Sequence, residues 1–299
     1  CTYYILPTRN VIPWIAKIKF ILNIIKMISK KYNIKSSVLL SVVSVINPKI
    51  LITFIDNSPV MGLVNEVFPD KLSITVQSGM RSKMFGFNKK GYQVLYGFGK
   101  FEEKLLNFQD IKVDEYVAAG SVKQGLSGKY IEYSETETDS DICYLSSFVG
   151  GLLNSDTKVS ASYLQYDKLF FSSLVDICKN NSLRLTIAMR SEKSSEAYHL
   201  EYEYFKEMDP DNIVKMIPNN KKSYRSYNTA NSAKVVFCTF STLGFEMFGV
   251  GKKVLFGASA NNFDLAEEYD AKWNFENLPS LVLLSELKMD NISKKLKKL

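Results

Sequence analysis

The stretch Val235-Val-Phe-Cys-Thr-Phe-Ser-Thr-Leu-Gly-Phe-Glu-Met-Phe-Gly-Val-Gly-Lys-Lys-Val-Leu-Phe-Gly257 contains a strand, a turn, a short helix and a second strand in close succession. Residues 235–238 favour a strand, residues 239–244 break it, and a helical pattern then leads into a buried strand at 253–256. In a parallel sheet, such a unit places the turn and the helix N-terminus at the carboxyl edge, where ligands bind. The stretch therefore predicts an α/β fold with a ligand site at this turn.

Polar side chains at this turn are suited to an anionic or polyol ligand. Ser241 and Thr242 place hydroxyls beside the first N–H groups of the helix, and Glu246 can accept hydrogen bonds from sugar or ribose hydroxyls. The same residues also have structural explanations, because Ser and Thr commonly cap helices and Glu complements the helix dipole. Both interpretations stay open when each residue is considered separately.

Length and composition indicate a globular protein with two domains of ordinary size. Its 299 residues predict two domains, and a hydrophobic content of 46% with 13% aromatics excludes general disorder. The formal charge of +7 and pI near 9.0 suit an anionic donor, an anionic bilayer surface or nucleic acid. Nucleic acid is not an expected partner, since the chain has no zinc finger, RNA-recognition motif or long basic arm.

Cysteine and histidine usage argues against a metal centre. Cys1, Cys143, Cys178 and Cys238 are far apart in sequence and are expected to be reduced, buried thiols of a cytoplasmic protein. His199 is the only histidine, which excludes mechanisms that need a His pair or a His-rich metal site. These residues therefore predict no cysteine- or histidine-based metal centre.

A basic amphipathic helix is predicted near the N-terminus, over about residues 14–32. Its lysines prevent it from spanning a membrane, but two other roles stay open. It can pack against the core with a solvated lysine face, or it can lie on an anionic membrane.

The first domain is expected to cover residues 1–133 and to contain a parallel sheet. The predicted strands are residues 49–55, 72–76, 92–98 and 116–119, with helices at 59–67 and 100–106 between them. Polar residues follow the first two strands and should meet at one edge. They are Asp56, Asn57, Gln77 and Arg81.

An acidic, aperiodic segment at 134–141 is the expected linker, and residues 142–299 are expected to form a second domain. This domain opens with a strand at 142–145, which is followed by Ser146 and Ser147. A strand at 184–188 has Arg190 at its tip. The repeated strand–helix order again predicts a doubly wound parallel sheet.

Ser-Thr-Leu-Gly-x-Glu at 241–246, followed by Gly-Lys-Lys-Val-Leu-Phe at 251–256, resembles the nucleotide-sugar-binding segment of GT-B glycosyltransferases. Segments 55–58, 76–81 and 96–100 are similar to those of bacterial surface-polysaccharide transferases, including relatives of capsule and O-antigen enzymes that use CMP-activated Kdo. One departure is Gln77-Ser-Gly, where those enzymes are expected to have Gln-His-Gly or Gln-Asn-Gly.

The resemblance implies two Rossmann-like parallel-sheet domains facing a cleft. The N-terminal domain would bind a glycan or lipid-linked acceptor, and the C-terminal domain would bind a CMP- or UDP-linked sugar. Donor-binding residues would be Ser146, Ser147, Ser241, Thr242, Gly244 and Glu246, and acceptor-binding residues Asn57, Gln77 and Arg81.

Glycosyl transfer also needs groups that perform the chemistry. Arg190, together with the helix N-terminus at Ser241, is expected to stabilise the departing phosphate. Asp56 is the best-placed carboxylate to act as base or nucleophile, although it can equally be a helix N-cap. The resemblance also implies a metal-independent mechanism, because GT-B enzymes do not need a divalent ion for this step. We therefore expect no bound metal and no cofactor other than the nucleotide-linked sugar, which is a substrate.

The sequence thus predicts a cytoplasmic glycosyltransferase and leaves open a peripheral contact with the inner face of the plasma membrane. Two kinds of alternative stay open. One is a related enzyme, such as a sugar-nucleotide epimerase or a glycerophosphotransferase. The other is a catalytically silent scaffold of the same fold that binds a glycan or a protein.

Overall fold

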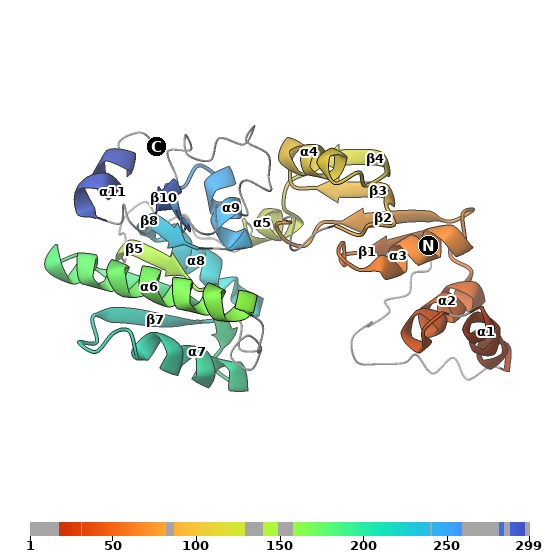
Figure 1. The fold of residues 1–299 in the computed structure, drawn as a ribbon, viewed down its shortest axis with the longest axis horizontal. Helices are drawn as coiled ribbons and strands as arrows, with labels where there is room; N and C mark the ends of the chain where they lie inside the picture. Colours follow the sequence, from red (N-terminus) through yellow and green to blue (C-terminus); the bar gives the residue numbers. More distant parts are fainter. Residues whose placement is uncertain are drawn as a thin grey trace. The chain divides into compact units, whose positions relative to one another are not determined.

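The computed structural model describes residues 18–30, 32–81, 87–128, 140–148, 158–239, 241–258, 281–283 and 288–296. The chain divides into two compact units, residues 1–121 and 122–299, each containing one parallel sheet (Figure 1). The predicted fold class, two Rossmann-like parallel-sheet units, is confirmed.

The division between the units falls earlier than the expected boundary at 133, because helix α5 (Val122–Ser127) groups with the second unit. No helix was predicted for these residues. The last two residues of the expected linker, Ser140 and Asp141, begin strand β5 (Ser140–Leu145), so the prediction was wrong for them. The rest of that linker, 134–139, lies outside the described residues.

The sheet of the first unit has the order β1-β2-β3-β4, with all neighbours parallel. Its strands are β1 (Ile50–Thr53), β2 (Leu72–Val76), β3 (Tyr92–Gly97) and β4 (Val113–Ala118). Its helices are α1 (Ile18–Ser29), α2 (Ile34–Ile46), α3 (Pro59–Val67) and α4 (Lys100–Phe108). The first three helices share a core of Met27, Leu40, Val43, Met61 and Val64.

The second sheet has the order β10-β9-β8-β5-β6-β7, again all parallel. The strands after β5 are β6 (Leu185–Glu192), β7 (Val214–Asn219), β8 (Ala233–Cys238), β9 (Val254–Ala258) and β10 (Leu281–Leu283). The helices are α6 (Lys158–Asn180), α7 (Glu196–Lys206), α8 (Arg225–Asn231), α9 (Thr242–Gly249) and α11 (Met289–Leu296), with a 3₁₀ turn at Lys221–Ser223.

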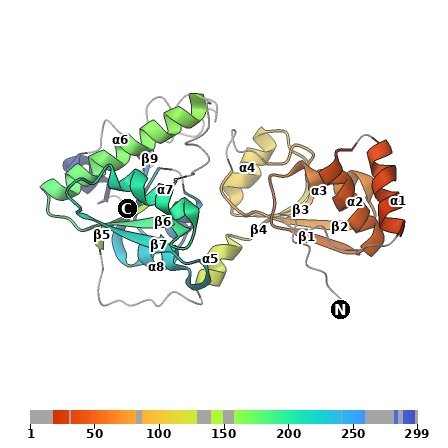
Figure 2. The ribbon, with the colours of Figure 1, turned by 90° about the horizontal axis from the view of Figure 1, so that it is seen from below.

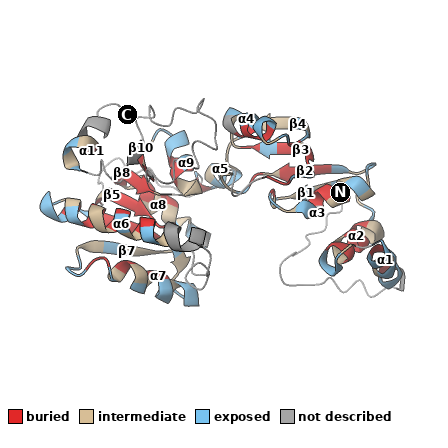
Figure 3. Cartoon of the chain, viewed as in Figure 1, coloured by how far each residue is buried: buried red, intermediate tan, exposed pale blue. Residues whose placement is uncertain are grey.

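Alternate residues of β5 contribute to two cores on opposite faces of this sheet. Tyr144 packs with aromatic residues of α6 and α7, whereas Cys143 packs with residues of α8 and α9. Figure 2 shows α6 and α7 on one face and α8 on the other, and in Figure 3 strands β5 and β8 are mostly in the red of buried residues. The described cysteines, Cys143, Cys178 and Cys238, are buried free thiols, as expected.

The strand order reverses within the second sheet. Strands β6 and β7 lie to one side of β5, whereas β8 and β9 lie to its other side. In open α/β sheets, ligands bind at such a switch point, beyond the carboxyl ends of the strands. The candidate site is therefore the pair of loops that follow β5 and β8.

Candidate functional site

Hydroxyl groups from both loops meet at the switch point. Ser147 follows β5 and Thr239 follows β8, and their side-chain oxygens lie 3.4 Å apart although the residues are far apart in sequence. Ser146 and Ser147 are buried, while Thr239, Ser241 and Thr242 are half-exposed. Four of the predicted donor-binding residues thus follow the carboxyl ends of two neighbouring strands: Ser146 and Ser147 follow β5, and Ser241 and Thr242 follow β8.

A buried carboxylate that no sequence pattern indicated lies directly beneath these loops. Asp167 on α6 is 1% exposed and accepts hydrogen bonds from Tyr144 at 2.6 Å and Thr239 at 2.8 Å. The hydroxyl of Tyr204 lies 3.4 Å from its other oxygen. Burial raises the pKa of Asp167, and the three hydroxyl donors oppose that shift. The carboxylate fixes the orientation of the Thr239 hydroxyl.

Helix α9 starts at this site and packs closely onto β8. Ser241 is its N-cap residue without a side-chain capping bond, and the Ser241 carbonyl accepts from the Gly244 amide at 3.0 Å. An added Cβ on Gly244 would lie 2.4 Å from the Cys238 sulfur. Gly244, predicted as a donor-binding residue, therefore has a packing role that lets the helix approach the strand.

Glu246, on the next turn of α9, is 7% exposed and accepts a hydrogen bond from the Tyr227 hydroxyl at 2.6 Å. Burial and the nearby Glu246 charge raise the pKa of Tyr227, so its hydroxyl stays protonated and donates. Tyr227 belongs to α8, and its contribution was not foreseen from the sequence. The pair fixes the orientation of the Glu246 carboxylate.

Arg190 lies near the carboxyl end of β6, beside the loop that follows β5. Its guanidinium donates to the Phe148 carbonyl at 3.4 Å, and its own side chain is exposed. The buried Glu201 of α7 accepts from the backbone amides of Arg190 and Ser191 at 2.8 and 2.9 Å. Glu201 therefore fixes the irregular end of β6 from which the guanidinium extends.

Two of the polar residues predicted in the first unit, Asp56 and Arg81, also come together. Asp56 is fully buried and forms a two-pronged ion pair with Arg81, in which the Arg81 Nε lies 2.5 Å from Oδ2. The Ser78 hydroxyl donates to Asp56 Oδ1 at 2.8 Å. Both carboxylate oxygens are occupied, so in this structure Asp56 holds the loop after β2 and does not face solvent.

Gln77 and Asn57 have different surroundings. The Gln77 side chain is 3% exposed; it donates to the Gly79 carbonyl at 2.9 Å and accepts from the Phe98 amide at 3.0 Å, so it joins the tips of β2 and β3. Asn57, in contrast, is exposed beside Asp56. Of these two predicted acceptor-binding residues, Asn57 has the accessible side chain.

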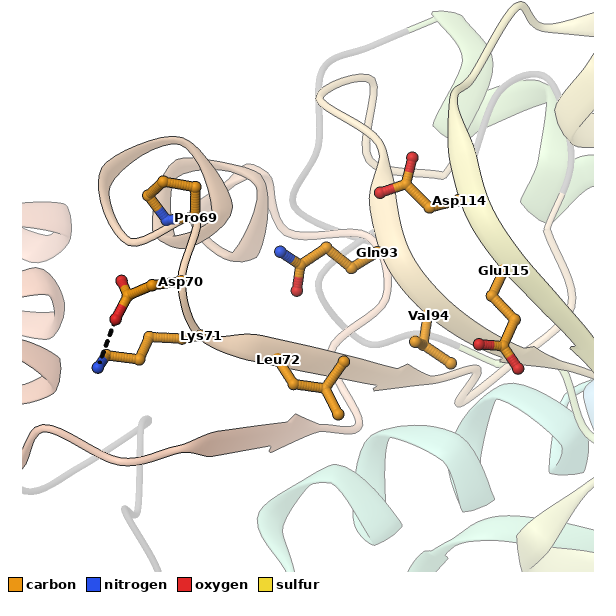
Figure 4. A pocket seen from close by; sticks show the side chains of 8 residues that line it. All are labelled: Pro69, Asp70, Lys71, Leu72, Gln93, Val94, Asp114 and Glu115. Atoms are coloured by element: carbon orange, nitrogen blue, oxygen red, sulfur yellow. Dashed lines mark ion pairs between the residues drawn. The ribbon is translucent and has the colours of Figure 1, made fainter.

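A hollow of about 400 Å³ lies in the first unit, but at the amino-terminal halves of its strands (Figure 4). Leu72, Val94 and Glu115 line it, beside an ion pair between Asp70 and Lys71 at 2.7 Å. Since Asp56 and Gln77 follow the carboxyl ends of their strands, this hollow is separate from the candidate residues.

Two further findings apply to the described part of the chain. It contains no group of three or more His, Cys, Asp or Glu side chains arranged to hold a metal ion. Over the same residues, none of the helices combines the length and apolar character needed to cross a bilayer.

The chain is similar to known proteins in a family pattern and in its fold. Residues 74–280 match the model of a family described as "putative O-antigen biosynthesis protein". None of the curated protein sequences matches the chain.

Several solved structures share the fold. They include the Staphylococcus aureus MnaA–UDP structure (13% identity, 92% of this chain and 72% of that chain, TM-score 0.57). Two others are UDP-GlcNAc 2-epimerases, from Neisseria meningitidis bound to UDP-GlcNAc (11%, 88% and 71%, 0.57) and from Methanocaldococcus jannaschii with UDP-GlcNAc and UDP (10%, 88% and 73%, 0.52). At these identities the similarity establishes a common GT-B fold.

Proposed function

The chain belongs to the O-antigen biosynthesis family that its residues 74–280 match, and from this premise we propose that it is a metal-independent glycosyltransferase. It would move a sugar from a nucleotide-activated donor to a surface-glycan or lipid-linked acceptor on the cytoplasmic side of the membrane. The observation that carries this proposal is the set of hydroxyl-bearing loops at the switch point of the second sheet, with the N-terminus of α9 beside them.

The donor phosphate would bind at the N-terminus of α9, since helix N-termini and loop hydroxyls stabilise anions. Arg190, whose guanidinium reaches the loop after β5, would neutralise the charge that grows on the leaving phosphate. Glu246, oriented by Tyr227, would accept hydrogen bonds from ribose or sugar hydroxyls. UDP is the first nucleotide to test, because structures of this fold contain UDP; CMP is the second, because of the resemblance to Kdo transferases.

The proposal also needs a catalytic base for the acceptor hydroxyl. Asp56 remains the candidate, but for it to accept the acceptor's proton, Arg81 must release at least one of the two carboxylate oxygens. Binding of the acceptor beside the exposed Asn57 would move Arg81 away from that oxygen. Without it, Asp56 would be a positioning residue for the loop that contains Arg81.

The test is a transfer assay with radiolabelled UDP-, GDP- and CMP-sugars and a lipid-linked acceptor. Arg190→Ala should lower kcat by about 100- to 1,000-fold, the loss typical of one transition-state charge stabiliser. Arg184→Ala is the matched control, because Arg184 precedes the amino end of the same strand. Unchanged turnover in Arg190→Ala, or no transfer from any donor by the wild type, would overturn the proposal.

The alternative to test is epimerisation, favoured by the two UDP-GlcNAc 2-epimerases that share the fold. An epimerase converts its sugar nucleotide without an acceptor, so incubation with UDP-GlcNAc alone distinguishes the two activities. Appearance of the C2 epimer would establish the alternative. Sugar incorporation that depends on the acceptor would support transfer.

A further inference from the structure

Helix α1 is fixed to the first unit along one side only. Phe20 and Met27 are 6% and 5% exposed, and Met27 lies in the core shared by α1, α2 and α3. On the same side, the Asn23 amide donates to the Ser44 hydroxyl of α2 at 3.2 Å. These contacts fix which face of α1 is turned away from the unit.

The outward face of α1 is apolar. Ile21, Leu22, Ile25 and Ile28 are 55%, 59%, 59% and 45% exposed. At 100° per residue they occupy a sector of about 120°, next to the side that packs on α2. Ile34, at the start of α2, is 71% exposed. Four exposed large aliphatic side chains on one face of a short helix form a patch of the kind that marks an interaction surface.

Basic residues border this patch, and residues 1–55 include no acidic residue. Lys26, Lys30 and Lys35 are exposed beside it. The first acidic residue of the chain is Asp56. The basic residues that precede it are Arg9, Lys17, Lys19, Lys26, Lys30, Lys31, Lys35 and Lys49. These eight basic residues exceed the formal charge of +7 of the whole chain, so the rest of the chain is close to neutral.

We propose that this surface, defined by Ile21, Leu22, Ile25 and Ile28 with Lys26 and Lys30 and called the α1 face, docks onto an anionic lipid bilayer. An amphipathic helix binds in the plane of such a surface by burying apolar side chains, while its lysines contact anionic headgroups. A second copy of the chain is a poorer fit, because it would place the same lysines against one another. The inference depends on this face alone and does not require the proposed transfer reaction.

The experiment is co-sedimentation of the full chain with phosphatidylcholine vesicles, with and without about one quarter phosphatidylglycerol. We expect at least about tenfold stronger partitioning onto the anionic vesicles, with the difference lost at high salt. Leu22→Glu should lower that partitioning by about tenfold or more. Lys26→Gln and Lys30→Gln should each lower it about fivefold, which corresponds to about 1 kcal/mol per lysine.

The matched control is Leu200→Glu, which places the same substitution on an exposed leucine of α7, 47% exposed. It should leave vesicle binding unchanged. Equal binding to neutral vesicles, or equal losses in Leu22→Glu and Leu200→Glu, would overturn the inference. So would light scattering that shows a dimer dissociated by Leu22→Glu, since the α1 face would then join two copies. Because all of these side chains are exposed, the melting temperature should stay within a few degrees of wild type.

Discussion

At the scale of single residues, Asp167 shows how a buried carboxylate can support a ligand site without being part of its surface. Its three hydroxyl partners differ in position: Tyr144 and Tyr204 come from the core, whereas Thr239 follows β8 into the hydroxyl loops. The Thr239 hydroxyl also lies 3.4 Å from that of Ser147. Asp167 therefore connects the core to the loop, and this connection can be tested separately from core stability.

Thr239→Val and Tyr144→Phe each remove one hydroxyl donor from Asp167. Thr239→Val should raise the Kd for UDP about five- to tenfold, because the loop loses a hydrogen bond worth about 1 kcal/mol. Tyr144→Phe should lower the free energy of unfolding by a similar amount and leave the Kd unchanged. Calorimetric titration and urea unfolding measure the two effects. Equal effects of the two variants on the Kd would show that Asp167 acts only through general stability.

The ion pair between Asp56 and Arg81 is expected to be a major local contribution to the stability of the first unit. Asp56→Asn leaves the guanidinium nearly buried without its counter-charge, so it should cost about 3–5 kcal/mol in urea unfolding. Glu66→Gln is the control, because its pair with Lys90 is exposed and should be worth at most about 1 kcal/mol. If Asp56→Asn were as mild as Glu66→Gln, the pair would not hold the loop after β2.

At the scale of elements, the ends of single helices and strands could be predicted where neighbouring residues determine them. Strand β2 and helix α3 begin and end at the expected residues, since periodicity and the flanking Pro and Asp residues define them. Segment 235–256 likewise forms the expected strand, helix and strand. Because the segment has the order strand, helix, strand, the donor-site candidates Ser241 and Thr242 lie at the carboxyl edge of the sheet.

Contacts between distant segments could not be predicted in this way. Asp167 and Thr239 are 72 residues apart, so their pairing depends on the strand order, which composition does not reveal. Asp141 was assigned to a linker because acidic, polar segments usually form loops, yet it is a strand residue with two basic partners.

Helix α9 can pack this closely against β8 only because residue 244 is a glycine and has no side chain. In Gly244→Ala the new Cβ would lie 2.4 Å from the Cys238 sulfur, so the N-terminus of α9 must move and UDP binding should weaken by at least about tenfold. Gly249→Ala is the control in the same helix, because nothing lies within 4 Å of its added Cβ. It should be neutral or stabilise by up to about 1 kcal/mol. Similar UDP affinities for both variants would contradict this account.

Asp141 joins the amino ends of three strands and gives a pH-dependent prediction. Its carboxylate lies 2.7 Å from the Lys234 Nζ and accepts from the Arg184 amide at 2.9 Å. The hydrogen bonds from Lys234 and Arg184 hold the pKa of Asp141 well below its usual range. A lowered pKa means that the folded state binds the proton less tightly, so the stabilisation is present above the unfolded pKa of about 3.9 and is lost as pH falls.

Asp141→Asn should therefore lower the free energy of unfolding by about 1.5 kcal/mol at pH 7, with the difference from wild type shrinking below about pH 4. Urea unfolding across this pH range measures it. A constant difference down to pH 2, or one that grows as pH falls, would show that the ionised carboxylate is not the stabilising form.

At the scale of the whole molecule, the parallel sheets of the two units differ in strand order. The described strands of the first unit follow one another in sequence order, whereas the order in the second reverses between β5 and β8. Only the second sheet therefore provides a switch point among the residues described. Each unit also has its own buried core, so ligand stabilisation can be confined to one of them.

Hydrogen exchange with and without UDP can locate the ligand on one unit. At about 100 times its Kd, UDP should stabilise the unit that binds it by about 2.7 kcal/mol, which slows exchange through the opening of that unit about 100-fold. We expect the slowing in peptides from β5, β8 and α9, and no change in peptides from β2 and β3. Arg184→Ala should keep this pattern, and Gly244→Ala should lose it. Protection confined to the first unit would contradict the assignment of the donor site to the hydroxyl loops, because mass action stabilises the unit to which the nucleotide binds.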